Sequence, residues 1–152
     1  MTDETGVVYW DASAILSVLF KDRHSDHALK WAHRSHVHFI STLAQAEVCA
    51  VIMRLKREHH ISAPLVKVSH EALDQGPWRR LVLEPEWGLT QELSQKWNLR
   101  GADLWHLATA KTLQKELPEL MLLTFDSRLA QSAEGEGLRV SDNLSANPPA
   151  GS

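Results

Sequence analysis

The feature of this sequence that most constrains its fold is a series of short, almost wholly apolar runs that alternate with stretches of helical spacing. The runs predict strands at residues 7–10, 37–40, 81–84, 120–125 and 138–140. Strands that are apolar throughout and separated by helices indicate a parallel sheet that is covered on both faces. The expected architecture is therefore a three-layer α/β/α domain with a central parallel sheet of about four to five strands.

Apolar spacing and capping residues predict the helices between these strands. The expected helices cover about residues 12–20, 25–36, 42–59, 62–74, 89–97 and 102–115, and a short stretch from Ser127. We expect Ser25 and Thr42 to cap the second and third helices, and Gly76-Pro77 to end the fourth.

The length and composition of the chain predict one soluble domain. A chain of 152 residues, 43% of them hydrophobic, can bury a single core. We expect the domain over residues 1–140, followed by a Pro-, Ser-, Asn- and Gly-rich, flexible tail over residues 141–152. No apolar run is long enough to span a membrane, the acidic N-terminus lacks the features of a secretory signal, and the single Cys49 excludes an internal disulfide. These features favour the cytoplasm.

Four acidic residues are placed to meet at one edge of the predicted sheet. In open α/β sheets, ligands bind beyond the carboxyl ends of the strands, where the strand order reverses. Asp11 directly follows the first strand, and Asp126 directly follows the most apolar one. Asp103 lies near the start of its helix, and Glu47 lies about one turn into the helix after the second strand. If the strands before Asp11 and Asp126 are neighbours, all four side chains reach the same edge.

A set of ligands that consists of carboxylates alone favours Mg²⁺ or Mn²⁺. Carboxylates held close together repel one another unless cations neutralise them. Such a site suits metal-assisted phosphodiester hydrolysis, in which one ion lowers the pKa of a water and a second stabilises the leaving oxygen. The net charge of −3 argues mildly against nucleic-acid binding, but two bound divalent cations would bring the formal charge to about +1.

Around these residues, the sequence resembles PIN domains in four segments that occur in order: VVYWDASAIL, STLAQAEVCAVI, LRGADLWHLATA and LLTFDSRLAQSA. The resemblance extends over about residues 7–140. It implies a metal-dependent ribonuclease similar to the VapC toxins of bacterial toxin–antitoxin pairs. It also implies that Asp11, Glu47, Asp103 and Asp126 are both catalytic and metal-binding. Two features depart from the family pattern: Trp105 stands where a small residue is commoner, and the chain is rich in Trp and His.

The resemblance implies an RNA substrate, an antitoxin protein as partner, and a homodimer. The sequence adds a physical reason for the dimer, because a small domain cannot fully bury two further helices at residues 27–36 and 62–74. Apolar residues left at a surface usually mark an interface, and two-fold pairing is the commonest way to cover them. The apolar residues in question are Trp31, Ala32, Leu65, Val66 and Val68.

Each acidic residue also has a purely structural interpretation. Asp11 and Asp126 are suited to cap a helix or form a turn, Asp103 to favour a helix N-terminus, and Glu47 to a solvated helix face. The shared context of all four favours the metal site.

Other polar residues are candidates for supporting roles. Ser13 and Thr124 are placed to orient the metal ligands, with local backbone bonding as the alternative. His106 is expected to be packed and hydrogen-bonded rather than catalytic. Trp78 could stack a base, although core packing is the default. The basic stretch 54–60 could line a path for the RNA backbone or be a solvated helix end.

Two other functions stay open. The fold could be retained as a non-catalytic RNA-binding or interaction module, although the presence of all four acids argues against this. A phosphatase-like hydrolase or response-regulator receiver also places Asp residues at strand ends. Receivers pair two acids after the first strand and keep a Lys after the last, whereas here Asp11 has no acidic neighbour and no Lys closely follows Asp126.

Overall fold

In the computed structural model, which describes residues 5–141, five parallel strands form one central sheet. The strands are β1 (Val7–Trp10), β2 (Val37–Ser41), β3 (Trp78–Leu81), β4 (Met121–Leu123) and β5 (Arg139–Val140). Their spatial order is β3-β2-β1-β4-β5, so β1 pairs with β2 on one side and with β4 on the other. The predicted parallel sheet is confirmed, and the strand order reverses at β1, where β1 and β4 are neighbours.

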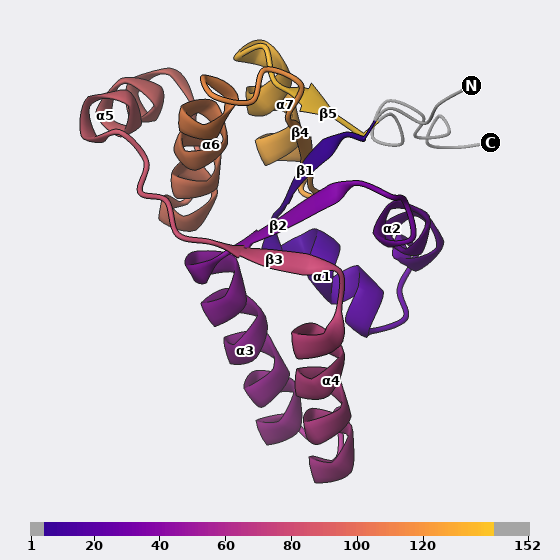
Figure 1. Ribbon diagram of the computed structural model, residues 1–152. Coiled ribbons are helices and arrows are strands. Elements are labelled where there is room, and N and C mark those ends of the chain that lie inside the picture. Colours follow the sequence, from indigo (N-terminus) through magenta and orange to yellow (C-terminus); the bar gives the residue numbers. More distant parts are fainter. Residues whose placement is uncertain (1–4, 142–152) are drawn as a thin grey trace, which may run out of the picture.

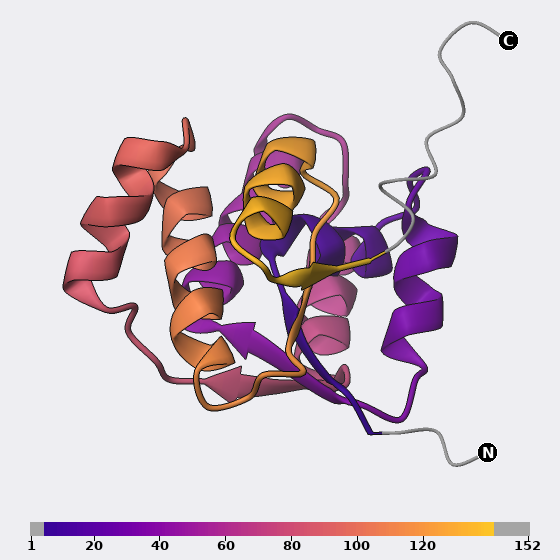
Figure 2. The ribbon, with the colours of Figure 1, turned by 90° about the horizontal axis from the view of Figure 1, so that it is seen from above.

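Helices cover both faces of the sheet (Figures 1 and 2). Those in the described part of the chain are α1 (Ala12–Leu19), α2 (Ser25–Ala32), α3 (Thr42–Arg57), α4 (Ala63–Gln75), α5 (Trp87–Lys96), α6 (Gly101–Gln114) and α7 (Ser127–Gly135). The buried residues of α1 to α4 pack on one face of the sheet, and those of α5 to α7 pack on the other. The result is the three-layer α/β/α architecture that the sequence predicts.

The two cores explain why the strands are apolar throughout. Successive residues of a strand point to opposite faces of the sheet. Accordingly, Tyr9 packs in the core beneath α5 to α7, whereas Trp10 packs in the core beneath α1 to α4. Both side chains are fully buried. A strand that is covered on both faces has no solvated side, so it shows no polar alternation.

The third predicted strand exists, but its predicted bounds, residues 81–84, are wrong. The observed β3 runs from Trp78 to Leu81 and pairs with β2 alone, at the edge of the sheet. An edge strand is only partly covered, and Arg79 and Arg80 are exposed. Residues 82–86 instead form a linker between β3 and α5.

The helix predicted over residues 25–36 is shorter than expected and ends at Ala32. Gly6, the residue before β1, holds His36 and Val37 next to the sheet through two hydrogen bonds. The backbone N–H of Gly6 donates to Nδ1 of His36 at 2.8 Å, and the N–H of Val37 donates to the carbonyl of Gly6 at 2.9 Å. These bonds are incompatible with a helix that continues to His36.

Two predicted caps are also corrected. Ser25 is the first residue of α2 rather than its cap, and its hydroxyl accepts from the N–H of Asp22 at 2.8 Å. Ser41, not Thr42, caps α3 by accepting from the N–H of Ala44 at 3.1 Å. In both cases the cap prediction is one residue away from the observed helix boundary.

The predicted tail over residues 141–152 lies, apart from Ser141, outside the described residues. The single domain over residues 1–140 stays a proposal. Within residues 5–141, no helix combines the length and the apolar character needed to cross a membrane.

Candidate active site

The four predicted carboxylates line one cavity of about 280 Å³ at the point where the strand order reverses. Each comes from a different part of the fold. Asp11 and Asp126 directly precede α1 and α7, whereas Glu47 and Asp103 lie on α3 and α6. Ser13, Arg100 and His106 contribute to the same wall. The structure therefore brings together the residues that the sequence places at one edge.

Asp11 is buried and held by three donors. The hydroxyl of Thr124 donates to Oδ2, while the hydroxyl of Ser13 and the N–H of Ala14 donate to Oδ1 at 2.7 and 3.0 Å. The bond from Ala14 makes Asp11 the cap of α1. Burial raises the pKa of Asp11 above its ordinary value, although these three hydrogen bonds oppose the shift. Both Ser13 and Thr124, the candidates for orienting ligands, thus contact a single carboxylate.

Asp126 combines a structural contact with an open oxygen. Its Oδ1 accepts from the N–H groups of Arg128 and Leu129, both at 3.0 Å, and this caps α7. Among the described residues, Oδ2 makes no hydrogen bond. The capping interpretation is therefore correct for Asp126, and it leaves one oxygen for another ligand.

Asp103 lies in the first turn of α6, and the charges of the other acidic residues affect its pKa. Its pKa is raised first by partial burial and then by the negative charges of Asp126, Asp11 and Glu47, against the effect of His106. The acidic groups thus share one electrostatic environment.

Glu47 is anchored through His106. The Nε2 atom of His106 lies 2.6 Å from Oε1 of Glu47, and the Nδ1 atom lies 2.7 Å from the hydroxyl of Tyr9. A carboxylate only accepts, so Nε2 carries the hydrogen, and in a singly protonated ring Nδ1 accepts from Tyr9. Burial raises the pKa of Tyr9, which keeps this donor protonated. The buried His106 is therefore packed and hydrogen-bonded, as predicted. The role of Tyr9 was missed, although a Tyr in an otherwise apolar strand was a signal.

Two arginines that the sequence analysis did not single out adjoin the carboxylates. Arg100 and Arg128 line a neighbouring cavity of about 240 Å³ that shares Asp103 and Asp126 with the first. Both side chains are exposed, and neither guanidinium forms an ion pair or a hydrogen bond within the described part of the chain. The usable signal was their position, three residues before Asp103 and two after Asp126.

The donor set of the cavity fits a hard divalent cation, because it consists of carboxylate oxygens. The side chains line the cavity without converging: within residues 5–141, no three Asp, Glu, His or Cys side chains form a group that could hold a metal ion as they stand. Without an ion, repulsion between the unneutralised carboxylates opposes their closer approach.

Two of the alternative RNA contacts are not supported by the structure. Trp78 packs edge-on against Trp10, with ring centroids 5.4 Å apart, and belongs to the core beneath α1 to α4. The default interpretation of core packing therefore applies to Trp78. The basic stretch 54–60 lies at the end of α3 opposite to the end that approaches the sheet (Figure 1).

Comparison with known proteins gives consistent relatives. The family model of the PIN domain matches residues 8–135. Ribonuclease VapC46 of Mycobacterium tuberculosis is 31% identical over 133 residues, which are 88% of this chain and 95% of that protein.

Solved structures show the same fold at low identity. The FitAcB structure from Neisseria gonorrhoeae has a TM-score of 0.61 and 18% identity, and the match covers 88% of this chain and 95% of that one. The VapBC2 structure from Rickettsia felis, bound to a DNA fragment from its promoter, has a TM-score of 0.60 and 13% identity, with coverage of 89% and 97%.

Proposed function

Since this chain belongs to the PIN domain family, we propose that it is a metal-dependent ribonuclease that hydrolyses RNA phosphodiester bonds and acts as the toxin of a toxin–antitoxin pair. The observation that carries the proposal is the meeting of Asp11, Glu47, Asp103 and Asp126 in one cavity where the strand order reverses. The 31% identity to a ribonuclease over most of both chains supports it.

The four carboxylates are the catalytic and metal-binding residues of this proposal, with Mg²⁺ or Mn²⁺ as the cofactor. A bound ion of this kind supplies an activated water and neutralises charge that develops on the phosphate. The chain itself keeps the ligands oriented. Ser13 and Thr124 fix the two oxygens of Asp11, and His106 fixes Glu47.

Arg100 and Arg128 contact the RNA backbone in this proposal. A guanidinium binds phosphate through paired hydrogen bonds, and these two lack protein partners within residues 5–141. The N-terminus of α6 has no side-chain cap, so its free N–H groups favour the same anion. The guanidinium groups of Arg100 and Arg128 lie beside the carboxylates and supply local positive charge for the RNA, although the chain as a whole has a net charge of −3.

The partners of this proposal are an antitoxin protein and a second copy of the chain. Solved relatives include VapBC and FitAB structures, which supports an antitoxin. Exposed apolar residues on α4, Leu65 and Val68, supply a surface for a homodimer. A cytoplasmic location, where RNA and an antitoxin are available, completes the proposal.

An assay on end-labelled RNA tests the function. We expect cleavage with Mg²⁺ or Mn²⁺, no cleavage with EDTA, and loss of cleavage in Asp11→Asn. The matched control is Glu92→Gln, which removes an exposed carboxylate of α5 outside the cavity and is expected to cleave normally. Cleavage that survives EDTA, or that requires Zn²⁺ alone, contradicts the metal assignment. Intact RNA at high protein concentration would instead favour the non-catalytic RNA-binding or interaction module.

A further inference from the structure

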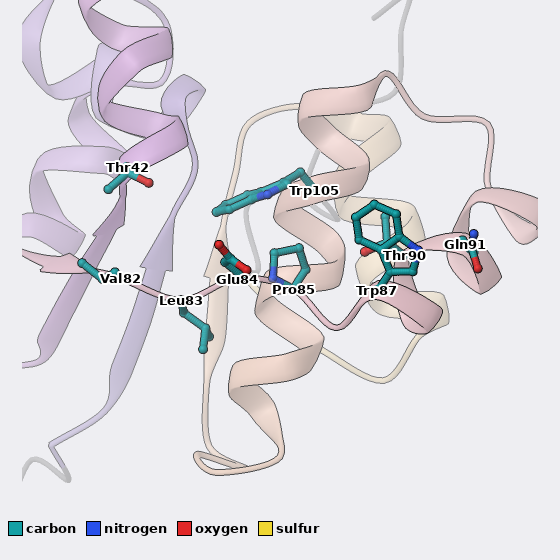
Figure 3. A pocket seen from close by; sticks show the side chains of 9 residues that line it. All are labelled: Thr42, Val82, Leu83, Glu84, Pro85, Trp87, Thr90, Gln91 and Trp105. Carbon is teal, nitrogen blue, oxygen red and sulfur yellow. The ribbon is translucent and has the colours of Figure 1, made fainter.

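A second, larger cavity of about 540 Å³ lies beside the carboxylate site (Figure 3). Three elements and one linker enclose it: the first turn of α3, the linker 82–86, the start of α5, and α6. We call it the tryptophan cavity. Its lining residues are Thr42, Val82, Leu83, Glu84, Pro85, Trp87, Thr90, Gln91 and Trp105. Figure 3 shows the ring of Trp105 projecting from α6 toward the side of Thr42, above Glu84 and Pro85 in this view.

The tryptophan cavity shares a wall with the carboxylate cavity. The ring of Trp105 meets the ring of His106 edge to face, with centroids 5.7 Å apart and an interplanar angle of 87°. On its other side, His106 bonds Glu47 at 2.6 Å, and both of these residues line the carboxylate cavity. The contact between Trp105 and His106 therefore joins the walls of the two cavities, and these two rings lie between a ligand in one cavity and a ligand in the other.

The lining of the tryptophan cavity suits a flat, neutral ring with polar edges. It offers two indoles, the amide of Gln91, the carboxylate of Glu84 and the hydroxyls of Thr42 and Thr90, of which the hydroxyl of Thr90 also donates to the carbonyl of Glu86. None of its nine described lining residues is Lys, Arg or His, so it does not suit a phosphate. Val82 and Trp87 are 88% and 83% exposed, so apolar surface of the lining is open to a ligand.

We propose that the tryptophan cavity binds an unpaired nucleobase of the RNA substrate, stacked on Trp105, next to the phosphodiester at the carboxylates. This inference rests on the proposed ribonuclease function and names the part of the RNA that the chain holds. Single-stranded RNA is commonly recognised by bases that stack on aromatic side chains. The size of the cavity falls in the range of small-ligand sites, about 300–1,000 Å³. An interface with another protein needs a broader surface, roughly 800 Å² on each partner.

The placement of charge supports the same orientation of the RNA. Arg100 lies in the wall of the carboxylate cavity and in that of its arginine-lined neighbour, whereas Trp105 and His106 form the wall toward the tryptophan cavity. The phosphates therefore meet the arginines, and the base meets the indoles. Each half of a nucleotide faces the chemistry that binds it.

The test measures RNA binding by fluorescence anisotropy. The probe is a labelled eight-nucleotide single strand that spans a site cleaved by the wild-type chain. Binding is measured with Mg²⁺ in the Asp126→Asn background, where we expect the RNA to stay intact on a gel. We expect Trp105→Leu and Trp87→Leu to weaken binding by roughly 5- to 100-fold, as for the loss of a stacked base, and Trp105→Phe to weaken it much less. The control Trp97→Phe changes an indole that bonds Glu136 outside the cavity, and we expect unchanged affinity.

A second measurement changes the RNA instead of the protein. Eight probes each lack the base at one position. We expect one position near the cleaved bond to lose affinity in the background chain but not in Trp105→Leu, because the stacking partner is already gone. Equal affinity for all eight probes, or unchanged binding by Trp105→Leu, overturns the proposal. If Trp105→Leu is unfolded by circular dichroism, Trp87→Leu and the probe series in the background chain decide.

Two further outcomes separate this proposal from others. RNA that is cleaved without dependence on Trp105 or Trp87 overturns the base cavity and leaves the ribonuclease function intact, whereas the absence of all cleavage overturns that function as well. If Trp87→Leu changes the sedimenting mass and leaves RNA affinity unchanged, the cavity is a self-association surface, and the proposal is wrong.

Discussion

Glu47 and His106, which are 59 positions apart in the sequence, lie in contact at the carboxylate cavity, with Oε1 of Glu47 2.6 Å from Nε2 of His106. The other ring nitrogen of His106 bonds the hydroxyl of Tyr9, which belongs to the central strand β1. A carboxylate at the edge of the site is therefore fixed to the core of the sheet through one buried ring.

Replacing His106 tests this connection. His106→Phe removes the hydrogen bond between Nδ1 and the buried hydroxyl of Tyr9, which also interacts with Ser41, and we expect a cost of about 1 kcal/mol in the free energy of unfolding. It also frees Glu47, so we expect the dissociation constant for Mn²⁺ to rise roughly 10- to 100-fold. Urea unfolding and calorimetric titration measure the two effects. The control Tyr9→Phe keeps the contact between His106 and Glu47 and should change Mn²⁺ affinity less. Equal Mn²⁺ affinity in His106→Phe and wild type would show that the contact does not orient Glu47.

Asp126 both caps a helix and lines the cavity, and three substitutions separate these roles. Asp126→Ala removes the cap of α7 and is expected to lower the free energy of unfolding by about 1 kcal/mol. Asp126→Ser and Asp126→Asn keep a capping oxygen, so we expect stability close to that of the wild type but no RNA cleavage. Thermal unfolding and the labelled-RNA assay provide the measurements. Full cleavage by Asp126→Ser would restrict Asp126 to its structural role.

The charged form of Asp103 is disfavoured in the metal-free site, first by burial and then by the neighbouring acids. Burial and the charges of Asp126 and Asp11 raise its pKa in the folded state. A carboxyl with a raised folded pKa binds its proton more tightly in the folded state, so it adds stability as pH falls and destabilises the fold when charged. We therefore expect Asp103→Asn to leave the melting temperature of the metal-free protein at pH 7 unchanged or raise it.

The wild type should gain stability from Asp103 as the pH falls, and Asp103→Asn should lack this gain. Asp103→Asn should also no longer cleave RNA. Melting curves in EDTA across a pH series, alongside the cleavage assay, check both. A large fall in melting temperature at pH 7 would identify Asp103 as a structural residue.

Thr124 stabilises the charged form of Asp11, so its loss should show a characteristic pH dependence. The hydroxyl of Thr124 lowers the pKa of Asp11 against the larger effect of burial, and Thr124→Val should raise that pKa further. At neutral pH we expect a loss of about 1–3 kcal/mol in the free energy of unfolding, because a buried carboxylate loses a donor. The loss should shrink as pH falls through the pKa of Asp11. Chemical unfolding of both proteins at several pH values measures this, and a loss that is independent of pH would indicate a packing effect instead.

The residues that the sequence could locate are those whose position follows from the chain direction. Asp11 directly follows β1, Asp126 follows the end of β4 by three residues, and in a parallel sheet neighbouring strands end at the same edge. The prediction that the four acidic residues meet assumed that β1 and β4 are neighbours. The observed strand order confirms this assumption.

The contacts that the sequence could not locate depend on side-chain packing or on an edge strand. The link from Tyr9 to Glu47 crosses from β1 to α3 through α6, and no local pattern encodes it. The tryptophan cavity depends on the path of residues 82–86 after β3. The sequence did not predict that path because the exposed Arg79 and Arg80 of the edge strand lack the apolar pattern, whereas Val82 and Leu83 continue an apolar run beyond the end of β3.

The last prediction is a homodimer through α4. Leu65 and Val68 are 41% and 56% exposed and, three residues apart, share one face of the helix. The α2 part of the predicted surface is smaller than expected, because Trp31 and Ala32 are half-buried against the core. We expect sedimentation at micromolar concentration to give the mass of a dimer, and Val68→Lys to give a monomer, since a charge there stays unpaired in a closed two-fold interface.

The matched control for this prediction is Val82→Lys. Val82 is 88% exposed and lines the tryptophan cavity, whereas Val68 lies on α4. The two substitutions therefore add the same charge to different surfaces of the protein. We expect Val82→Lys to remain a dimer. A dimer that Val82→Lys disrupts and Val68→Lys does not would move the interface to the tryptophan cavity. A monomer that persists at high concentration, with cleavage rates proportional to enzyme concentration, would exclude the dimer, because activity that depends on association rises more steeply than the amount of protein.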